Sequence, residues 1–73
     1  MLENFTHVQL LQLANSSLGF TVDANRFTHI QLIQLANSAN SSKAQITILN
    51  HSNLTHSQLI QLGNAGGGNI TLA

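Results

Sequence analysis

Residues 27–37 read FTHIQLIQLAN, and this stretch decides the fold because the chain carries it three times. Residues 5–15 read FTHVQLLQLAN and residues 54–64 read LTHSQLIQLGN, so the copies match position by position. They begin 22 and 27 residues apart, and periods in this range are typical of solenoid and array proteins. We therefore expect the 73 residues to form a single repeat domain, with repeats at about residues 4–26, 27–53 and 54–73.

Every copy begins with a complete signal for the start of a helix. A threonine suited to the N-cap is followed three residues later by a glutamine, and the two can form a capping box. Apolar residues just before the threonine and at the fourth helical position can form a hydrophobic staple. The caps are Thr6, Thr28 and Thr55; the glutamines are Gln9, Gln31 and Gln58; the staple pairs are Phe5 with Leu10, Phe27 with Leu32, and Leu54 with Leu59.

Each predicted helix has one apolar stripe that ends on a small residue, which lets a neighbouring backbone approach closely. The stripes are Leu10, Leu11, Leu13 and Ala14; Leu32, Ile33, Leu35 and Ala36; and Leu59, Ile60, Leu62 and Gly63. We expect helices of roughly nine to eleven residues, and helices this short need packing to hold them in water.

A turn-rich stretch and a short strand pattern follow each helix. The strand runs alternate an apolar residue, a threonine and an apolar residue: they are Phe20, Thr21 and Val22; Ile46, Thr47 and Ile48; and Ile70, Thr71 and Leu72. Gly19 ends the first connection, glycines 66–68 form a turn into the last strand, and residues 38–44 are expected to be a longer polar loop. Strands joined through helices pair in parallel. The predicted fold is α/β, a short solenoid with a three-stranded parallel sheet, helices on one side and threonines on the other.

The composition excludes several classes of function. Charged residues make up 5% of the chain, against about 25% in typical soluble domains, and the four of them, Glu3, Asp23, Arg26 and Lys43, cancel. Two cations are too few to neutralise a phosphate backbone, so we expect no nucleic-acid partner. No apolar run approaches the ~18 residues of a membrane-spanning helix, so we expect no membrane insertion. There is no cysteine, carboxylate pair, catalytic triad or phosphate loop, so we predict neither an enzyme nor a cofactor.

The helix-plus-strand units resemble leucine-rich-repeat solenoids over nearly the whole chain, and this resemblance in architecture implies an α/β stack of repeats. Residues 54–67 also look like the first half of a TAL-effector DNA-binding repeat, in which a short capped helix leads into a glycine-rich loop. That local resemblance implies that Ala65 and Gly66 lie where the TAL-effector family reads a base.

Three histidines, His7, His29 and His56, occupy the same position in the first turn of each helix and are expected to form a column. Such a column can bind a metal ion or respond to pH. No cysteine or matching carboxylate accompanies it, so we interpret the histidines as exposed polar residues copied with the repeat and predict no metal site. His51 is expected in a loop without a recognisable partner.

Six of the nine asparagines stand in Asn-X-Ser/Thr sequons. These candidate glycosylation sites are Asn4, Asn15, Asn40, Asn50, Asn53 and Asn69. Sequons mark surface acceptor sites in proteins that meet a glycosylation machinery. The alternative is that a sequon is a by-product of the repeat, since the cap threonine completes the motif at Asn4 and Asn53.

The two outer strands of the predicted sheet would each present an unpaired edge, and no polar cap is evident beside them. The assembly edges are Phe20, Thr21, Val22, Ile70, Thr71 and Leu72. A contact between two different edges is head-to-tail and builds a ring or a filament. Our hypothesis is a structural, self-assembling homo-oligomer, a subunit of a filament or fibre outside the cell or at its surface; a cytoplasmic location is left open. The alternative is a fragment of a longer repeat array that binds a peptide or glycan.

Overall fold

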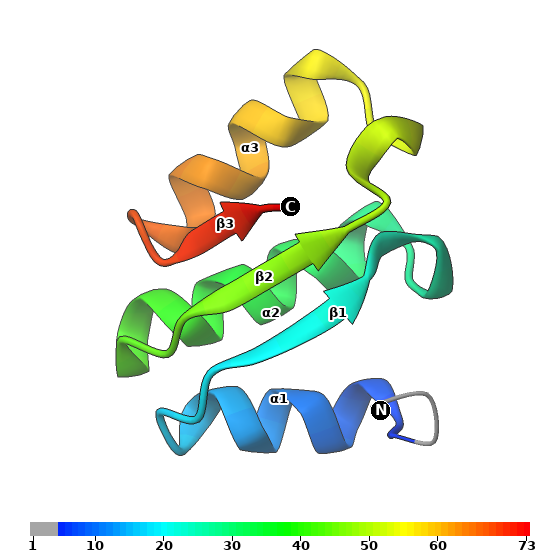
Figure 1. Ribbon diagram of the computed structural model, residues 1–73. Helices are drawn as coiled ribbons and strands as arrows, with labels where there is room; N and C mark the ends of the chain where they lie inside the picture. Colours follow the sequence, from blue (N-terminus) through cyan, green and yellow to red (C-terminus); the bar gives the residue numbers. More distant parts are fainter. Residues whose placement is uncertain (1–4) are drawn as a thin grey trace.

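The computed structural model describes residues 5–73, in which helices and strands alternate along the chain (Figure 1). The helices are α1 (His7–Asn15), α2 (His29–Ser42) and α3 (His56–Gly66); the strands are β1 (Phe20–Asp23), β2 (Ile46–Leu49) and β3 (Ile70–Leu72). One-turn 3₁₀ helices, η1 (Ala24–Arg26) and η2 (His51–Asn53), follow β1 and β2. The order α-β-α-β-α-β confirms the predicted α/β class.

The three strands form one parallel sheet in the order β1-β2-β3. The register places the central threonines side by side, Thr21 opposite Thr47 and Thr47 opposite Thr71. In Figure 1, α2 lies behind β2, and α1 and α3 lie beyond the two outer strands. The side chains of Ile46 and Ile48 are buried while the threonine between them is not, as expected for a sheet with helices on one face.

All three helix starts form as the sequence predicts. The hydroxyl of Thr28 accepts the backbone N–H of Gln31 at 3.2 Å, and the Gln31 side-chain carbonyl accepts the backbone N–H of Thr28 at 2.9 Å. The same reciprocal pair closes at Thr6 and at Thr55. Each box satisfies backbone donors that the first turn of a helix otherwise leaves free.

The core lies between the helices and the sheet. Its fully buried large side chains are Leu10, Leu32, Leu35, Ile46, Ile48 and Leu62. Ala14 and Ala36 have no exposed surface, which fits their place where adjacent helices approach. The residues before the caps, Phe5, Phe27 and Leu54, are partly buried and pack against this core.

Helix α2 differs from the prediction because it has 14 residues and ends at Ser42, within the expected loop at residues 38–44. Ala39 continues the apolar stripe one turn beyond Ala36, and both are fully buried. The Ser42 hydroxyl donates to the carbonyl of Ser38 at 3.0 Å and also to the carbonyl of Ala14 in α1. Lys43, with φ of 67°, then ends the helix. Burial and side-chain hydrogen bonds thus extend a helix through residues whose composition is typical of a turn.

The glycines at the end of the third repeat divide between helix and turn. Gly67 and Gly68 have φ of 56° and 90°, so they form the expected turn into β3. Gly66 instead belongs to the last turn of α3 and is buried. A side chain at residue 66 would overlap that of Ile70, so the close approach of α3 and β3 requires glycine here.

Candidate assembly surfaces

The third repeat leaves open a helix face that the first two repeats cover. The fifth residue after each cap is Leu11, Ile33 or Ile60; Leu11 and Ile33 pack against the core, whereas Ile60 is 51% exposed. The eighth residue is Ala14, Ala36 or Gly63; the alanines are fully buried, whereas Gly63 is exposed and has open space where a Cβ would lie. The expectation that Ile60 and Gly63 belong to a buried stripe is therefore wrong, because in residues 5–73 no further helix packs on this side of α3.

The first repeat shows the opposite pattern on its other side. The third residue after each cap is exposed in α1, where it is Gln9, but half-buried in α2 and α3. The seventh residue, Leu13 in α1, is half-buried, whereas Leu35 and Leu62 are 1% exposed. We call Gln9, Leu13 and the free edge of β1 the head surface. We call His56, Ile60, Gly63 and the free edge of β3 the tail surface.

The predicted edge residues lie on the two outer strands. Phe20, Thr21 and Val22 belong to β1, and Ile70, Thr71 and Leu72 to β3. The apolar side chains are more exposed on β3 than on β2. Ile48 in the middle strand is fully buried, whereas its register partner Leu72 is 43% exposed. The edges therefore combine free backbone groups with partly open apolar side chains.

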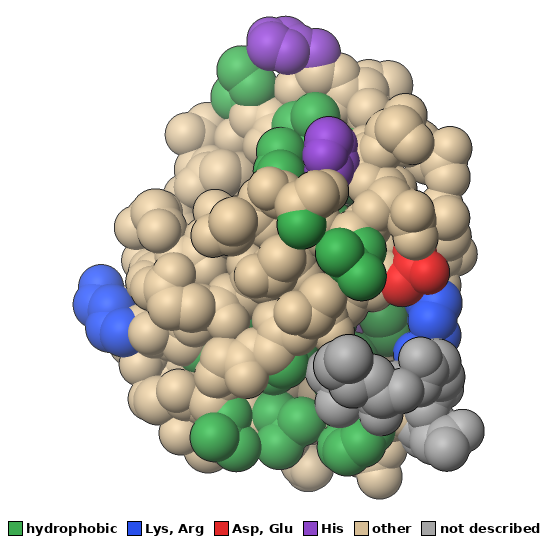
Figure 2. Space-filling model, viewed as in Figure 1, with side chains coloured by type: hydrophobic (Ala, Val, Ile, Leu, Met, Phe, Trp, Pro, Cys, Tyr) green, Lys and Arg blue, Asp and Glu red, His purple; other side chains and the backbone are tan. Residues whose placement is uncertain are grey.

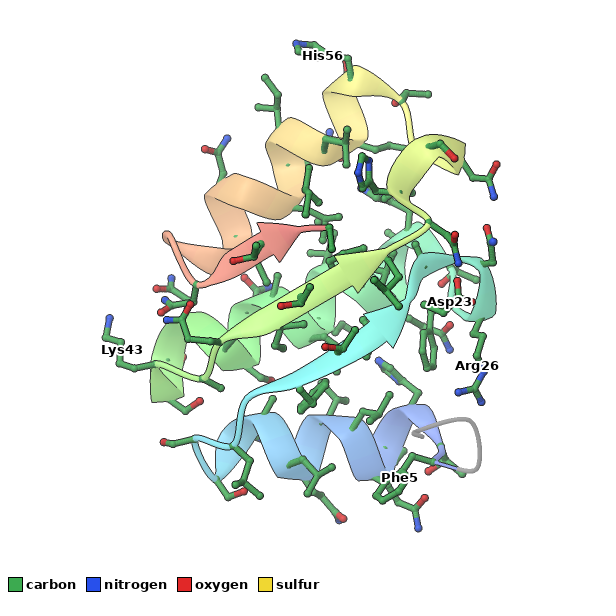
Figure 3. The ribbon with its side chains drawn as sticks, viewed as in Figure 1. Phe5, Asp23, Arg26, Lys43 and His56 are labelled. Atoms are coloured by element: carbon green, nitrogen blue, oxygen red, sulfur yellow. The ribbon has the colours of Figure 1, made fainter. Side chains whose placement is uncertain are left out.

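The head and tail surfaces lie at opposite ends of the molecule. Figure 3 shows His56 pointing outward at the far end of α3, while Phe5 lies beside α1 at the other end. A second copy can therefore reach either surface without obstructing the other.

The three histidines at the shared repeat position have different surroundings. The His7 Nε2 donates to the backbone carbonyl of Gln31 at 3.3 Å, and its ring lies 6.2 Å from that of Phe27, so both contacts cross to the second repeat. His29 is half-buried, and its Nε2 is enclosed without a hydrogen-bond partner among the described residues. Only His56 is exposed. The interpretation of these histidines as exposed copies is wrong for the first two, because the second repeat contacts His7 and the Nε2 of His29 is buried.

Further polar contacts between repeats were not predicted. The Gln45 side-chain amide donates to the Asn69 side-chain carbonyl at 2.8 Å, and both residues directly precede a strand. Beyond the other ends of the strands, the side-chain amide of Asn53 in η2 donates to the side chain of Asn25 in η1. The Ser17 hydroxyl donates to the Ser42 carbonyl at 2.7 Å. The common position of Gln45 and Asn69 in the repeat is the signal that could have revealed their contact.

The three charged side chains of residues 5–73 lie away from the tail surface. Asp23 and Arg26 lie together near the end of β1, and Lys43 lies near the start of β2, at the opposite ends of the strands (Figure 3). Hydrogen bonds from the Asn50 side chain and the Asn25 backbone, with the nearby Arg26, hold the pKa of Asp23 below its ordinary value. On the face drawn in Figure 2 the surface is mostly uncharged. Within residues 5–73 no three potential metal ligands gather.

The sequons occupy different environments. Asn4 lies outside the described residues, and Asn15, Asn40, Asn50 and Asn53 are exposed. Asn69 is 7% exposed, and its amide nitrogen donates to the carbonyl of Gly66 at 2.9 Å. In the folded chain that nitrogen is therefore engaged by the turn that precedes β3.

The two positions of the TAL-effector resemblance lie inside α3 rather than in a loop, with Ala65 half-buried and Gly66 buried.

None of the helices in residues 5–73 has the length and apolar character to cross a membrane. Comparisons with protein-family models, with curated proteins and with solved structures gave no significant match. The resemblance to leucine-rich repeats therefore stays a prediction from the sequence.

Proposed function

We propose that this protein is a structural subunit that assembles head-to-tail, with the tail surface of one copy packed on the head surface of the next. The observation that carries the proposal is the exposure of Ile60 and Gly63 at positions that are covered in both preceding repeats. A second copy supplies the helix that would cover them.

The two surfaces match because the chain already makes the same contact twice. Helix α1 packs against α2, and α2 packs against α3. The fifth and eighth residues after the caps of α1 and α2 are covered, and the seventh residues of α2 and α3 are buried. A third contact of this kind would bring Ile60 and Gly63 of one copy against α1 of the next, at Leu13. The edges of β3 and β1 would then pair in parallel, with Ile70 opposite Phe20, as Ile46 and Ile70 pair within the chain.

The composition supports this assembly. The formal net charge is zero, so copies do not repel one another, and near-zero net charge favours association. Because the contact joins two different surfaces, each added copy presents a new tail and the stack can grow.

Ile60→Ser tests the proposal, with Ile30→Ser as the matched control. Both isoleucines are exposed on helices, at 51% and 64%, but only Ile60 belongs to the tail surface. Full burial of an isoleucine side chain contributes about 2 kcal/mol, and Ile60 is already half-buried, so Ile60→Ser should lose about 1 kcal/mol and weaken association about fivefold. Ile30→Ser should leave it unchanged, and the third repeat already has a serine, Ser57, at the position of Ile30. Sedimentation velocity across a concentration series would measure both.

Two results would contradict the proposal. One is a wild-type chain that sediments as a 7.8 kDa monomer at high micromolar concentration. The other is equal weakening by the two substitutions, which would indicate association through exposed apolar residues in general. Circular dichroism on each variant would check that the helices remain formed.

A further inference from the structure

We infer that His56 is the specific anchor of the tail surface, and that it binds a second copy of this chain between the ring of Phe5 and the backbone carbonyl of Gln9. This inference rests on the proposed head-to-tail assembly and adds the atoms that fix its register.

The geometry comes from the contact that His7 makes inside the chain. Its Nε2 donates to the Gln31 carbonyl at 3.3 Å, and its ring lies 6.2 Å from the Phe27 ring at an interplanar angle of 49°. Phe27 directly precedes the cap of the second repeat, and Gln31 is the glutamine of its capping box. One imidazole therefore contacts both residues that define the start of the next helix.

The equivalent residues at the start of the first repeat are Phe5 and Gln9. Gln9 is exposed, and its carbonyl is at the same place in α1 as the Gln31 carbonyl in α2. A carbonyl oxygen has two lone pairs, so it can accept an imidazole N–H in addition to its helical hydrogen bond. Phe5 is partly buried and packs against the core, as Phe27 does.

The three histidines share one repeat position but differ in exposure: His7 and His29 are half-buried, whereas His56 is exposed. The second repeat contacts His7, the Nε2 of His29 is buried without a hydrogen-bond partner among the described residues, and the ring of His56 is exposed at the end of the molecule (Figure 3). A second copy of the chain can offer His56 the surroundings that the second repeat gives to His7. His56 lies at one end of the molecule and Phe5 at the other, so the contact joins copies in a single direction.

The test compares His56→Ala, His56→Phe and the neighbouring control Ser57→Ala, all on the first turn of α3. Loss of one hydrogen bond and one ring contact should raise the dissociation constant of association about tenfold in His56→Ala. His56→Phe keeps a ring against Phe5 but has no donor, so it should fall between His56→Ala and the wild type. Ser57→Ala should stay within about twofold of the wild type. Sedimentation equilibrium would measure all four dissociation constants.

A monomeric variant shows whether His56 affects association or the stability of the fold. The arginine introduced by Gly63→Arg should block the tail surface and prevent association. In that variant His56→Ala should leave the thermal midpoint unchanged, because His56 is exposed. Equal dissociation constants for His56→Ala and a self-associating wild type would overturn the inference about His56 alone. A wild-type chain that stays monomeric would overturn the proposed assembly and this inference together.

Discussion

Two glycines of α3 show at the scale of single residues that the absence of a side chain has different consequences at different positions. Gly63 faces open space at the position where the other helices have a buried alanine. Gly66, three residues later, lies under Ile70 and leaves no room for a Cβ. At residue 63 a larger side chain would fit, whereas at residue 66 the close packing of α3 and β3 requires glycine.

Alanine substitution should therefore change stability in opposite directions at the two glycines. Gly63→Ala should raise the free energy of unfolding by about 1 kcal/mol, since glycine in a helix interior is unfavourable by that amount. Gly66→Ala should lower it, because overpacking against Ile70 costs about 1–3 kcal/mol and exceeds the gain in helix propensity. Urea unfolding followed by circular dichroism would measure both. A stabilised Gly66→Ala would show that Ile70 moves aside without cost.

The helix starts are the part of the fold that the sequence predicts best. The cap threonine, the glutamine and the staple pair are local features, so their contacts depend on a few adjacent residues, and all three capping boxes form as expected.

The end of α2 depends on tertiary contacts instead. Residues 38–42 include three serines and an asparagine, which favour turns, yet Ala39 packs in the core and Ser42 bonds to α1. The spacing of Ala36 and Ala39 was the available signal for the longer helix.

The capping box of the central helix offers a test at the scale of one element. Thr28→Ala removes the oxygen that accepts the Gln31 N–H and should lower the free energy of unfolding by about 1 kcal/mol. Thr28→Ser keeps the oxygen and should restore most of that loss. Urea unfolding of the two variants at equal concentration would measure the difference. Equal losses in both would indicate that the threonine methyl group, rather than the cap, holds the helix start.

For the whole molecule, the sequence predicts which strands are outermost but not which helix faces are open. Strand order follows from the order of the repeats, so residues 20–22 and 70–72 could be placed at the edges. The open face of α3 depends on which side of each helix its neighbour covers. Periodicity assigns Ile60 and Gly63 to the same stripe as Leu59 and Leu62 and does not distinguish the core side from the neighbour side. The partial burial of His7 and His29 likewise depends on tertiary packing, which the sequence pattern does not indicate.

The register of the assembly can be tested with cysteines, because the natural chain has none. Thr21 and Thr71 are separated by β2, hence by about 10 Å within one chain, which exceeds the ~7 Å limit for a disulfide. In a head-to-tail stack they would be neighbours in adjacent copies. Oxidation of the double variant Thr21→Cys, Thr71→Cys should therefore give a ladder of covalent oligomers on a non-reducing gel.

The single-cysteine variants are the controls for this experiment. Thr21→Cys alone and Thr71→Cys alone should remain mostly uncrosslinked, because a head-to-tail contact does not bring two copies of one position together. Efficient dimer formation by either single variant would indicate a symmetric edge-to-edge contact instead. The double variant Thr47→Cys, Thr71→Cys should close within one chain and confirm that oxidation is complete.

The different spacing of helices and strands has a consequence for the size of any assembly. Packed helices lie about 8–10 Å apart, whereas paired strands lie about 4.8 Å apart, and Figure 1 shows the helices spread more widely than the sheet. A stack that keeps both spacings is wedge-shaped at every step and bends with its sheet on the concave wall. The row of Thr21, Thr47 and Thr71 would line that wall. Curvature, more than protein concentration, would then set the number of copies per turn.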